Sequence, residues 1–98
     1  MAKKVKWSPL AERKFEEILA YWTNRNKSES FSEKLIDLFE DATELIASFP
    51  EMGRSTDLEN VRQKLVRDYL IFYEVDGEII NILTVWDPRE DPDKLELR

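Results

Sequence analysis

The chain contains no cysteine and no histidine. Without cysteine it can form neither a disulfide nor a thiolate metal site. Without histidine it lacks the most common general base, the most common metal ligand and the usual switch that titrates near neutral pH. No pair of carboxylates is accompanied by further ligand residues either. We therefore expect no metal site, no cofactor and no acid–base chemistry that depends on an imidazole or a thiol.

Long apolar runs are missing as well. No stretch of about 18 apolar residues is present to span a membrane, and the first residues lead into no apolar segment typical of a signal peptide. We expect a soluble, cytoplasmic protein without membrane contacts. The 98 residues are enough for one small domain, in which residues 87–98 form an acidic tail that contains prolines.

The net charge of −6 argues against broad nucleic-acid binding, which depends on clustered Lys and Arg side chains that displace counterions. Acidic residues dominate the middle of the chain and the tail. Basic residues gather near the N-terminus and in one central region, where they form a candidate local patch: Arg54, Arg62, Lys64 and Arg67. We do not expect direct, sequence-specific DNA binding.

The chain is organised around residues 61–89, which predict three successive β-strands. The proposed strands 61–66, 69–75 and 78–86 are rich in β-branched and aromatic residues, which suit a pleated, packed surface. Asp76-Gly77 predicts a tight hairpin turn, since this pair tolerates positive φ at both central positions. In the first of these strands, the two-residue period places Arg62 and Lys64 on the same side.

The N-terminal residues predict a short strand and then a helix. Residues 4–7 alternate in polarity, and they are followed by Ser8 as a helix N-cap and Pro9 at the first helical position. The apolar residues that come next recur at helical spacing up to about Arg25. The segment 24–27 should end this helix.

A second amphipathic helix should start near Ser28 or Ser30, because Ser30 with Glu33 matches a capping box. Its apolar stripe is continuous and consists of Phe31, Leu35, Leu38, Phe39, Ala42, Leu45, Ile46 and Phe49. Pro50 and Gly53 should end it. The two helices and their short connection predict an antiparallel helical hairpin, and residues 50–60 predict a polar loop.

These elements predict an α+β fold with the order β-α-α-β-β-β. The helical hairpin packs on one face of a twisted antiparallel sheet, and residues 4–7 join that sheet as an edge strand. A sheet with one face in water should alternate cleanly, yet residues 69–73 are apolar or aromatic throughout. The second face is therefore covered either within the monomer or by a partner. We favour an acceptor groove, formed by this face and the helical hairpin, that a partner protein or a second copy fills.

A series of short motifs extends from residue 4 to about residue 95: WSP at 7–9, FP at 49–50, GR at 53–54, Arg62, YLIFY at 69–73, and VWDPR at 85–89 with Pro92. Their order and spacing resemble the RelE/ParE superfamily, the toxin halves of bacterial type II toxin–antitoxin pairs. The resemblance implies the fold described above, a cognate antitoxin that wraps across the chain, and roles in growth inhibition and plasmid stabilisation. RelE-like members are ribosome-dependent mRNA endoribonucleases, whereas ParE-like members bind DNA gyrase.

The resemblance supplies candidate residues for a nuclease. Arg62 and Lys64 match two basic positions of RelE-like members, and Arg89 could stand in for a later arginine; such cations activate the 2′-hydroxyl and stabilise phosphate charge. However, Leu70 replaces an expected arginine, and no tyrosine follows Tyr73. We therefore favour a ParE-like binder. The alternatives are a RelE-like nuclease, a degenerate toxin that only binds its antitoxin, and an unrelated dimerising α+β module.

The residues that we expect to contact the target or the antitoxin are mainly Arg and aromatic residues, which often anchor protein interfaces. They are Arg54, Arg62, Lys64, Arg67, Tyr69, Tyr73, Trp86 and Arg89. Each has a simpler interpretation: the cations of the first strand could only protect a sheet edge, the two tyrosines could belong to the core, and Trp86 could lie at its rim.

Overall fold

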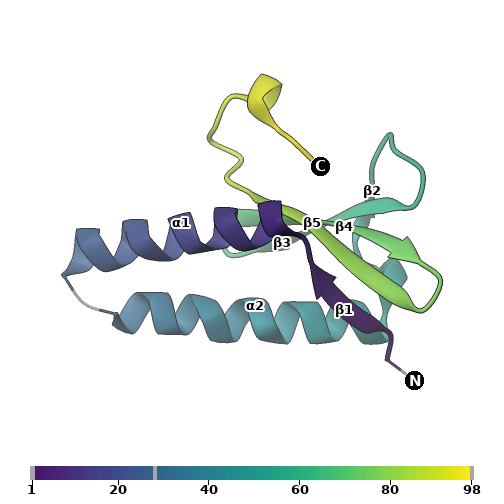
Figure 1. Ribbon diagram of the computed structural model, residues 1–98, viewed down its shortest axis with the longest axis horizontal. Coiled ribbons are helices and arrows are strands. Elements are labelled where there is room, and N and C mark those ends of the chain that lie inside the picture. The colour runs from purple at the N-terminus through teal and green to yellow at the C-terminus, as the bar shows by residue number, and fades with distance from the viewer. Residues whose placement is uncertain (1, 28, 98) are drawn as a thin grey trace.

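The computed structural model describes residues 2–27 and 29–97. Its elements are β1 (Lys4–Trp7), α1 (Pro9–Asn26), α2 (Ser30–Ser48), β2 (Arg54–Ser55), β3 (Val61–Val66), β4 (Tyr69–Asp76) and β5 (Ile79–Trp86), with single 3₁₀ turns η1 (Pro50–Met52) and η2 (Pro92–Lys94). Figure 1 shows two long helices side by side against a twisted sheet. The predicted α+β class and β-α-α-β-β-β order are confirmed. The short strand β2, which lies within the predicted loop 50–60, was not expected.

The sheet has the strand order β1-β5-β4-β3-β2. Strands β2 to β5 pair in antiparallel fashion, but β1 pairs in parallel with β5, so the sheet is mixed rather than purely antiparallel. The edge position of β1 agrees with the prediction. Its direction differs because the whole helical hairpin and three strands separate β1 from β5, and a connection of this length permits parallel pairing.

The hairpin between β4 and β5 lies one residue later than predicted. Asp76 pairs with Ile79, so the central residues of the turn are Gly77 and Glu78. Only Gly77 has a positive φ, of 57°. A turn with glycine at its first central position needs just one such residue, and this is why the chain does not use Asp76-Gly77 as the central pair.

The two helices begin in different ways. At α1, Ser8 is the N-cap, and its hydroxyl accepts a hydrogen bond from the Ala11 N–H at 3.0 Å, as predicted. At α2, the N-cap is Glu29 and makes no side-chain capping bond. Ser30 is therefore the first helical residue, and the predicted capping box at Ser30 is wrong. The alternative start at Ser28 lies outside the described residues.

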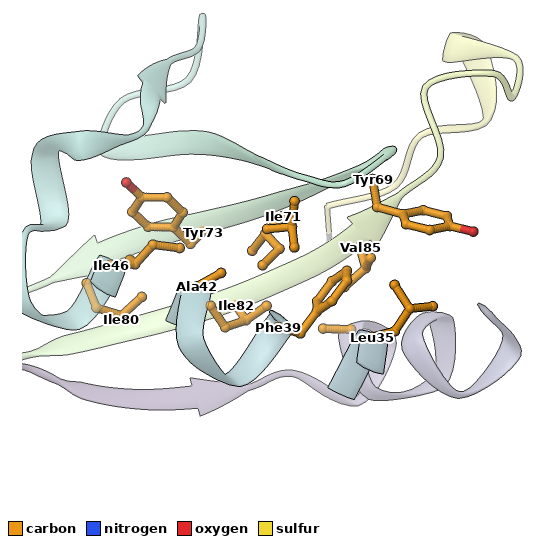
Figure 2. Close-up of a cluster of buried hydrophobic side chains, with 12 residues drawn as sticks. Leu35, Phe39, Ala42, Ile46, Tyr69, Ile71, Tyr73, Ile80, Ile82 and Val85 are labelled. Carbon is orange, nitrogen blue, oxygen red and sulfur yellow. The ribbon is translucent and has the colours of Figure 1, made fainter. Parts of the chain in front are cut away.

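The main core lies between the helical hairpin and one face of the sheet. Figure 2 shows side chains of α2 directed toward the central strands. The buried cluster includes Leu35, Phe39, Ala42 and Ile46 from α2 and Tyr69, Ile71, Tyr73, Ile80, Ile82 and Val85 from β4 and β5. The predicted stripe on α2 was too wide, because Leu38, Leu45 and Phe49 are 37%, 44% and 61% exposed.

A smaller cluster covers the other face of the sheet, which we call the second face. Its buried members are Val61, Phe72, Leu83 and Trp86. Leu95 and Leu97 from the C-terminal tail pack against them, and in Figure 1 the tail lies on the side of the strands away from α2. In the free chain the centre of the second face is thus covered by the chain itself, and not by a partner as we expected.

Candidate functional site

Tyr73 ties β4 to the segment that follows α2. Its side chain is fully buried. The hydroxyl donates a hydrogen bond to the Pro50 carbonyl at 2.7 Å and accepts one from the Gly53 N–H at 3.0 Å. A Cβ on Gly53 would collide with this hydroxyl. Burial raises the pKa of Tyr73 above 10.0, against smaller opposing effects of the Gly53 hydrogen bond and the Arg62 charge. Tyr73 is therefore a structural side chain, in agreement with the simpler interpretation.

Arg62 braces the same segment from β3. It lies opposite Tyr73 in the sheet, and its Nη1 donates hydrogen bonds to the carbonyls of Gly53 at 2.7 Å and Glu51 at 3.2 Å. Lys64, two residues further on, shares this side of the strand, as predicted. Within residues 2–27 and 29–97, Lys64 makes no hydrogen bond or ion pair. Of the two cations, Arg62 stabilises the backbone after α2, whereas the Lys64 ammonium group has no partner among the described residues.

The other predicted cations occupy separate exposed places. Arg54 lies on the edge strand β2. Arg67 lies not in a strand but in the turn between β3 and β4, where its φ is 58°. Its guanidinium carbon lies 5.5 Å from the centre of the Phe31 ring, an attractive cation–π arrangement. Arg67 thus connects this turn to the start of α2, just beyond the end of β3.

Arg89 forms a local ion pair with Asp87. Its Nη2 lies 2.8 Å from Oδ2 of Asp87, and its Nε donates a hydrogen bond to Oδ1 at 3.0 Å. These hydrogen bonds hold the pKa of Asp87 below its usual value and raise that of Arg89. The Arg89 side chain is largely exposed, so a partner could still reach it, although its charge is already partly neutralised.

The two remaining aromatic candidates are buried. Tyr69 is 4% exposed, and its hydroxyl accepts a hydrogen bond from the Trp22 Nε1–H at 2.7 Å. Trp86 is 5% exposed and belongs to the cluster on the second face. The prediction that Trp86 is an exposed contact is therefore wrong. Tyr69 and Tyr73 follow their simpler interpretation as core residues, although Tyr69 also lines a hollow beside α1.

The three cations proposed for nuclease chemistry do not share one cavity. Arg62 lines a groove of about 690 Å³ at the β2 edge of the sheet. Arg89 lines a different hollow of about 350 Å³ beside α1. Lys64 lines neither of them. In the described part of the chain, no three His, Cys, Asp or Glu residues are arranged to hold a metal, and no helix has the length and apolar character to cross a membrane.

The groove at the β2 edge brings together three large exposed apolar side chains that were not predicted to form a site. We call it the edge groove; its lining includes Phe49, Met52, Leu58, Val61, Lys3 and Arg62. Phe49, Met52 and Leu58 are 61%, 38% and 52% exposed. Phe49 also ends a row of exposed apolar residues along α2, which we call the α2 strip: Leu38, Leu45 and Phe49. Leu38 and Leu45 are seven residues apart and so lie on one side of the helix, and Phe49 follows at its C-cap.

A family model described as "ParE toxin of type II toxin-antitoxin system, parDE" matches residues 5–92. The chain belongs to the ParE toxin family. No individually curated protein matches it in sequence. The ParE assignment confirms the predicted membership of the RelE/ParE superfamily and places the chain on its ParE-like side.

Two solved structures share the fold of this ParE-family chain. One is described as the chromosomal ParDE system from P. aeruginosa, with a TM-score of 0.75 and 16% identity over 88% of this chain and 96% of the other. The second is described as the RelBE2 toxin–antitoxin complex from Mycobacterium tuberculosis, with a TM-score of 0.66 and 16% identity over 89% and 99%. At such low identity the likeness concerns the fold. Both descriptions name toxin–antitoxin systems, in agreement with the family assignment.

Proposed function

We propose that this ParE-family chain inhibits growth by binding a protein, that DNA gyrase is that protein, and that a cognate antitoxin neutralises it. The choice between binder and nuclease depends mainly on Arg62. A catalytic guanidinium must direct its N–H groups at the phosphate whose charge develops in the transition state. Nη1 of Arg62 instead donates to the carbonyls of Gly53 and Glu51, so the guanidinium is held against the chain and only its Nε and Nη2 donors remain for a phosphate.

The other candidate cations are better suited to contacts with a protein. Arg67 and Arg89 line one open hollow, whereas Arg54 on β2 and Lys64 on β3 lie apart from it. A phosphate in a nuclease site would need several of them around one centre, whereas a protein surface can meet them one at a time. We propose these four residues as target contacts.

We further propose that the antitoxin docks on the α2 strip and the edge groove. The exposed apolar residues of α2 continue into a groove that is itself lined by Met52 and Leu58. An amphipathic helix with apolar residues three and four apart suits such a surface. This surface is separate from the second face, whose centre the tail covers in the free chain.

The docking surface is tested with the double variant Leu45→Asp, Phe49→Asp. Both side chains are exposed, so the fold should persist while the affinity for the antitoxin falls about a hundredfold or more, the cost of losing two buried large apolar side chains at an interface. The matched control is Tyr21→Asp, an exposed aromatic residue on α1, which should leave the affinity unchanged. Unaltered antitoxin binding by a folded double variant would contradict the docking surface.

The mode of action is tested by inducing the chain without its antitoxin. We expect growth arrest, loss of DNA supercoiling and intact mRNA. If mRNA is cut at codons within translating ribosomes, and Arg62→Ala or Lys64→Ala abolishes the cutting, the nuclease alternative replaces this proposal. If growth continues, the chain is a degenerate toxin that keeps only antitoxin binding.

A further inference from the structure

The second face of the sheet is apolar at its centre and is covered by the C-terminal tail. Leu95 and Leu97 pack against the cluster formed by Val61, Phe72, Leu83 and Trp86. Both leucines are half-buried, whereas Glu96 between them is exposed. Side chains two residues apart lie on the same side of an extended segment. The tail thus presents one apolar side to the sheet and one acidic side to water.

The tail is attached to the sheet only weakly. Its backbone hydrogen bonds join tail residues to one another: Glu90 to Asp87, Lys94 to Asp91 and Leu95 to Pro92. Within residues 2–27 and 29–97, no backbone hydrogen bond links residues 90–97 to a strand. Two half-buried leucines therefore provide most of the attachment, and a segment held in this way opens at little cost in free energy.

The rims of the second face carry cations. In β1, Val5 and Trp7 pack on the helix side, so Lys4 and Lys6 point to the second face. On the opposite edge, Gln63 follows the helix-side residue Arg62 in β3 and therefore faces the second face. Arg54 pairs with Gln63, so Arg54 faces the second face as well. All three cations are exposed, and none forms an ion pair within the described residues.

The charge of the tail is complementary to these rims. Between Pro88 and Leu97 the tail carries four acidic residues, namely Glu90, Asp91, Asp93 and Glu96, against the two basic residues Arg89 and Lys94, and so has a net charge of −2. We propose that the second face is a docking surface for an acidic, extended segment of a partner protein with apolar side chains two residues apart, and that the tail occupies this surface in the free chain. The proposal goes beyond the α2 strip and the edge groove, and it does not depend on the identity of the target.

The test uses the full chain with Leu95→Ser and Leu97→Ser, and as probe a dye-labelled synthetic peptide with the sequence of residues 87–97. We expect the variant to bind the peptide about tenfold or more tightly than the wild type, because a tethered tail competes at a millimolar effective concentration. A peptide with serine in place of both leucines should not bind. Fluorescence anisotropy measures the affinities, and circular dichroism checks that the variant is folded.

Two further variants keep the test decisive if the first variant is unstable. Asp93→Lys with Glu96→Lys retains both leucines and changes only exposed positions; it should also bind the peptide more tightly than the wild type. Lys4→Glu with Lys6→Glu, placed in either background, should weaken peptide binding, whereas the control Lys34→Glu on α2 should not.

Two results would overturn the proposal. One is a folded tail variant that binds the peptide no better than the wild type. The other is a wild-type dimer that dissociates when Leu95 and Leu97 are replaced, because the tail would then cover the second face of another copy.

Discussion

Replacing Tyr73 with phenylalanine should destabilise the fold strongly although it removes a single oxygen atom. The hydroxyl is buried and makes two hydrogen bonds, to the Pro50 carbonyl at 2.7 Å and from the Gly53 N–H at 3.0 Å. The variant leaves both backbone groups without their partner. Because an unsatisfied buried polar group costs about 1–3 kcal/mol, we expect the free energy of unfolding to fall by about 2–4 kcal/mol.

For a domain of this size, a loss of this magnitude corresponds to a melting temperature lower by about 10–25 °C. Urea unfolding followed by tryptophan fluorescence should show a lower midpoint with an unchanged slope, since the buried surface stays the same. The control Tyr21→Phe removes an exposed hydroxyl whose one hydrogen bond, from an Arg25 nitrogen, is long at 3.5 Å. This variant should change the free energy of unfolding by less than about 0.5 kcal/mol. If Tyr73→Phe lowers the free energy of unfolding no more than this control does, the hydrogen bonds of Tyr73 do not stabilise the contact between β4 and the segment after α2.

Three further predictions concern the same region. Gly53→Ala should cost about 1–3 kcal/mol through overpacking, and in a Tyr73→Phe background its additional cost should be smaller, because the hydroxyl that its Cβ meets is gone. Stability should fall as the pH rises above 10.0, since the unfolded chain then releases the Tyr73 proton while the fold, in which the pKa is raised, retains it; a pH series of urea midpoints should show a shallower fall in Tyr73→Phe. Arg62→Met should lower the thermal midpoint, because the Gly53 and Glu51 carbonyls lose their donor, whereas Lys64→Met, at a residue without such bonds, should leave the midpoint nearly unchanged.

The long strands were predictable because their signals are local. The two-residue alternation and the turn residues placed β3, β4 and β5 within one or two residues of their observed ends. The parallel pairing of β1 was not predictable, since a four-residue pattern does not indicate which strand it joins or in which direction. The short strand β2 depends on the position of Gly53, and this position is set by Tyr73 from a distant part of the sequence.

The binding surfaces were harder to predict, for a physical reason. Helical spacing shows that Leu38, Leu45 and Phe49 belong to an apolar side of α2, but it cannot show how far the sheet extends beneath that side. The structure exposes these three residues, so a stripe that indicates a core also contains a candidate docking surface. In the same way, the two-residue period correctly placed Arg62 and Lys64 on one side of β3. It could not show that Arg62 donates hydrogen bonds to the backbone carbonyls of Gly53 and Glu51.

The cover of the second face was open to prediction only as an alternative. The apolar residues of β4 and β5 required some cover, and the sequence did not distinguish a partner from the chain itself. The actual cover consists of Leu95 and Leu97, two residues in an acidic segment that is too short to show a periodic pattern.

The central claim, that this ParE-family chain acts by binding gyrase, is tested most directly by a supercoiling assay with purified components. Purified chain should inhibit gyrase in proportion to its concentration. Replacing the four cations Arg54, Lys64, Arg67 and Arg89 with alanine should abolish the inhibition while the variant stays folded. Full supercoiling activity at a large molar excess of folded wild-type chain would contradict the claim.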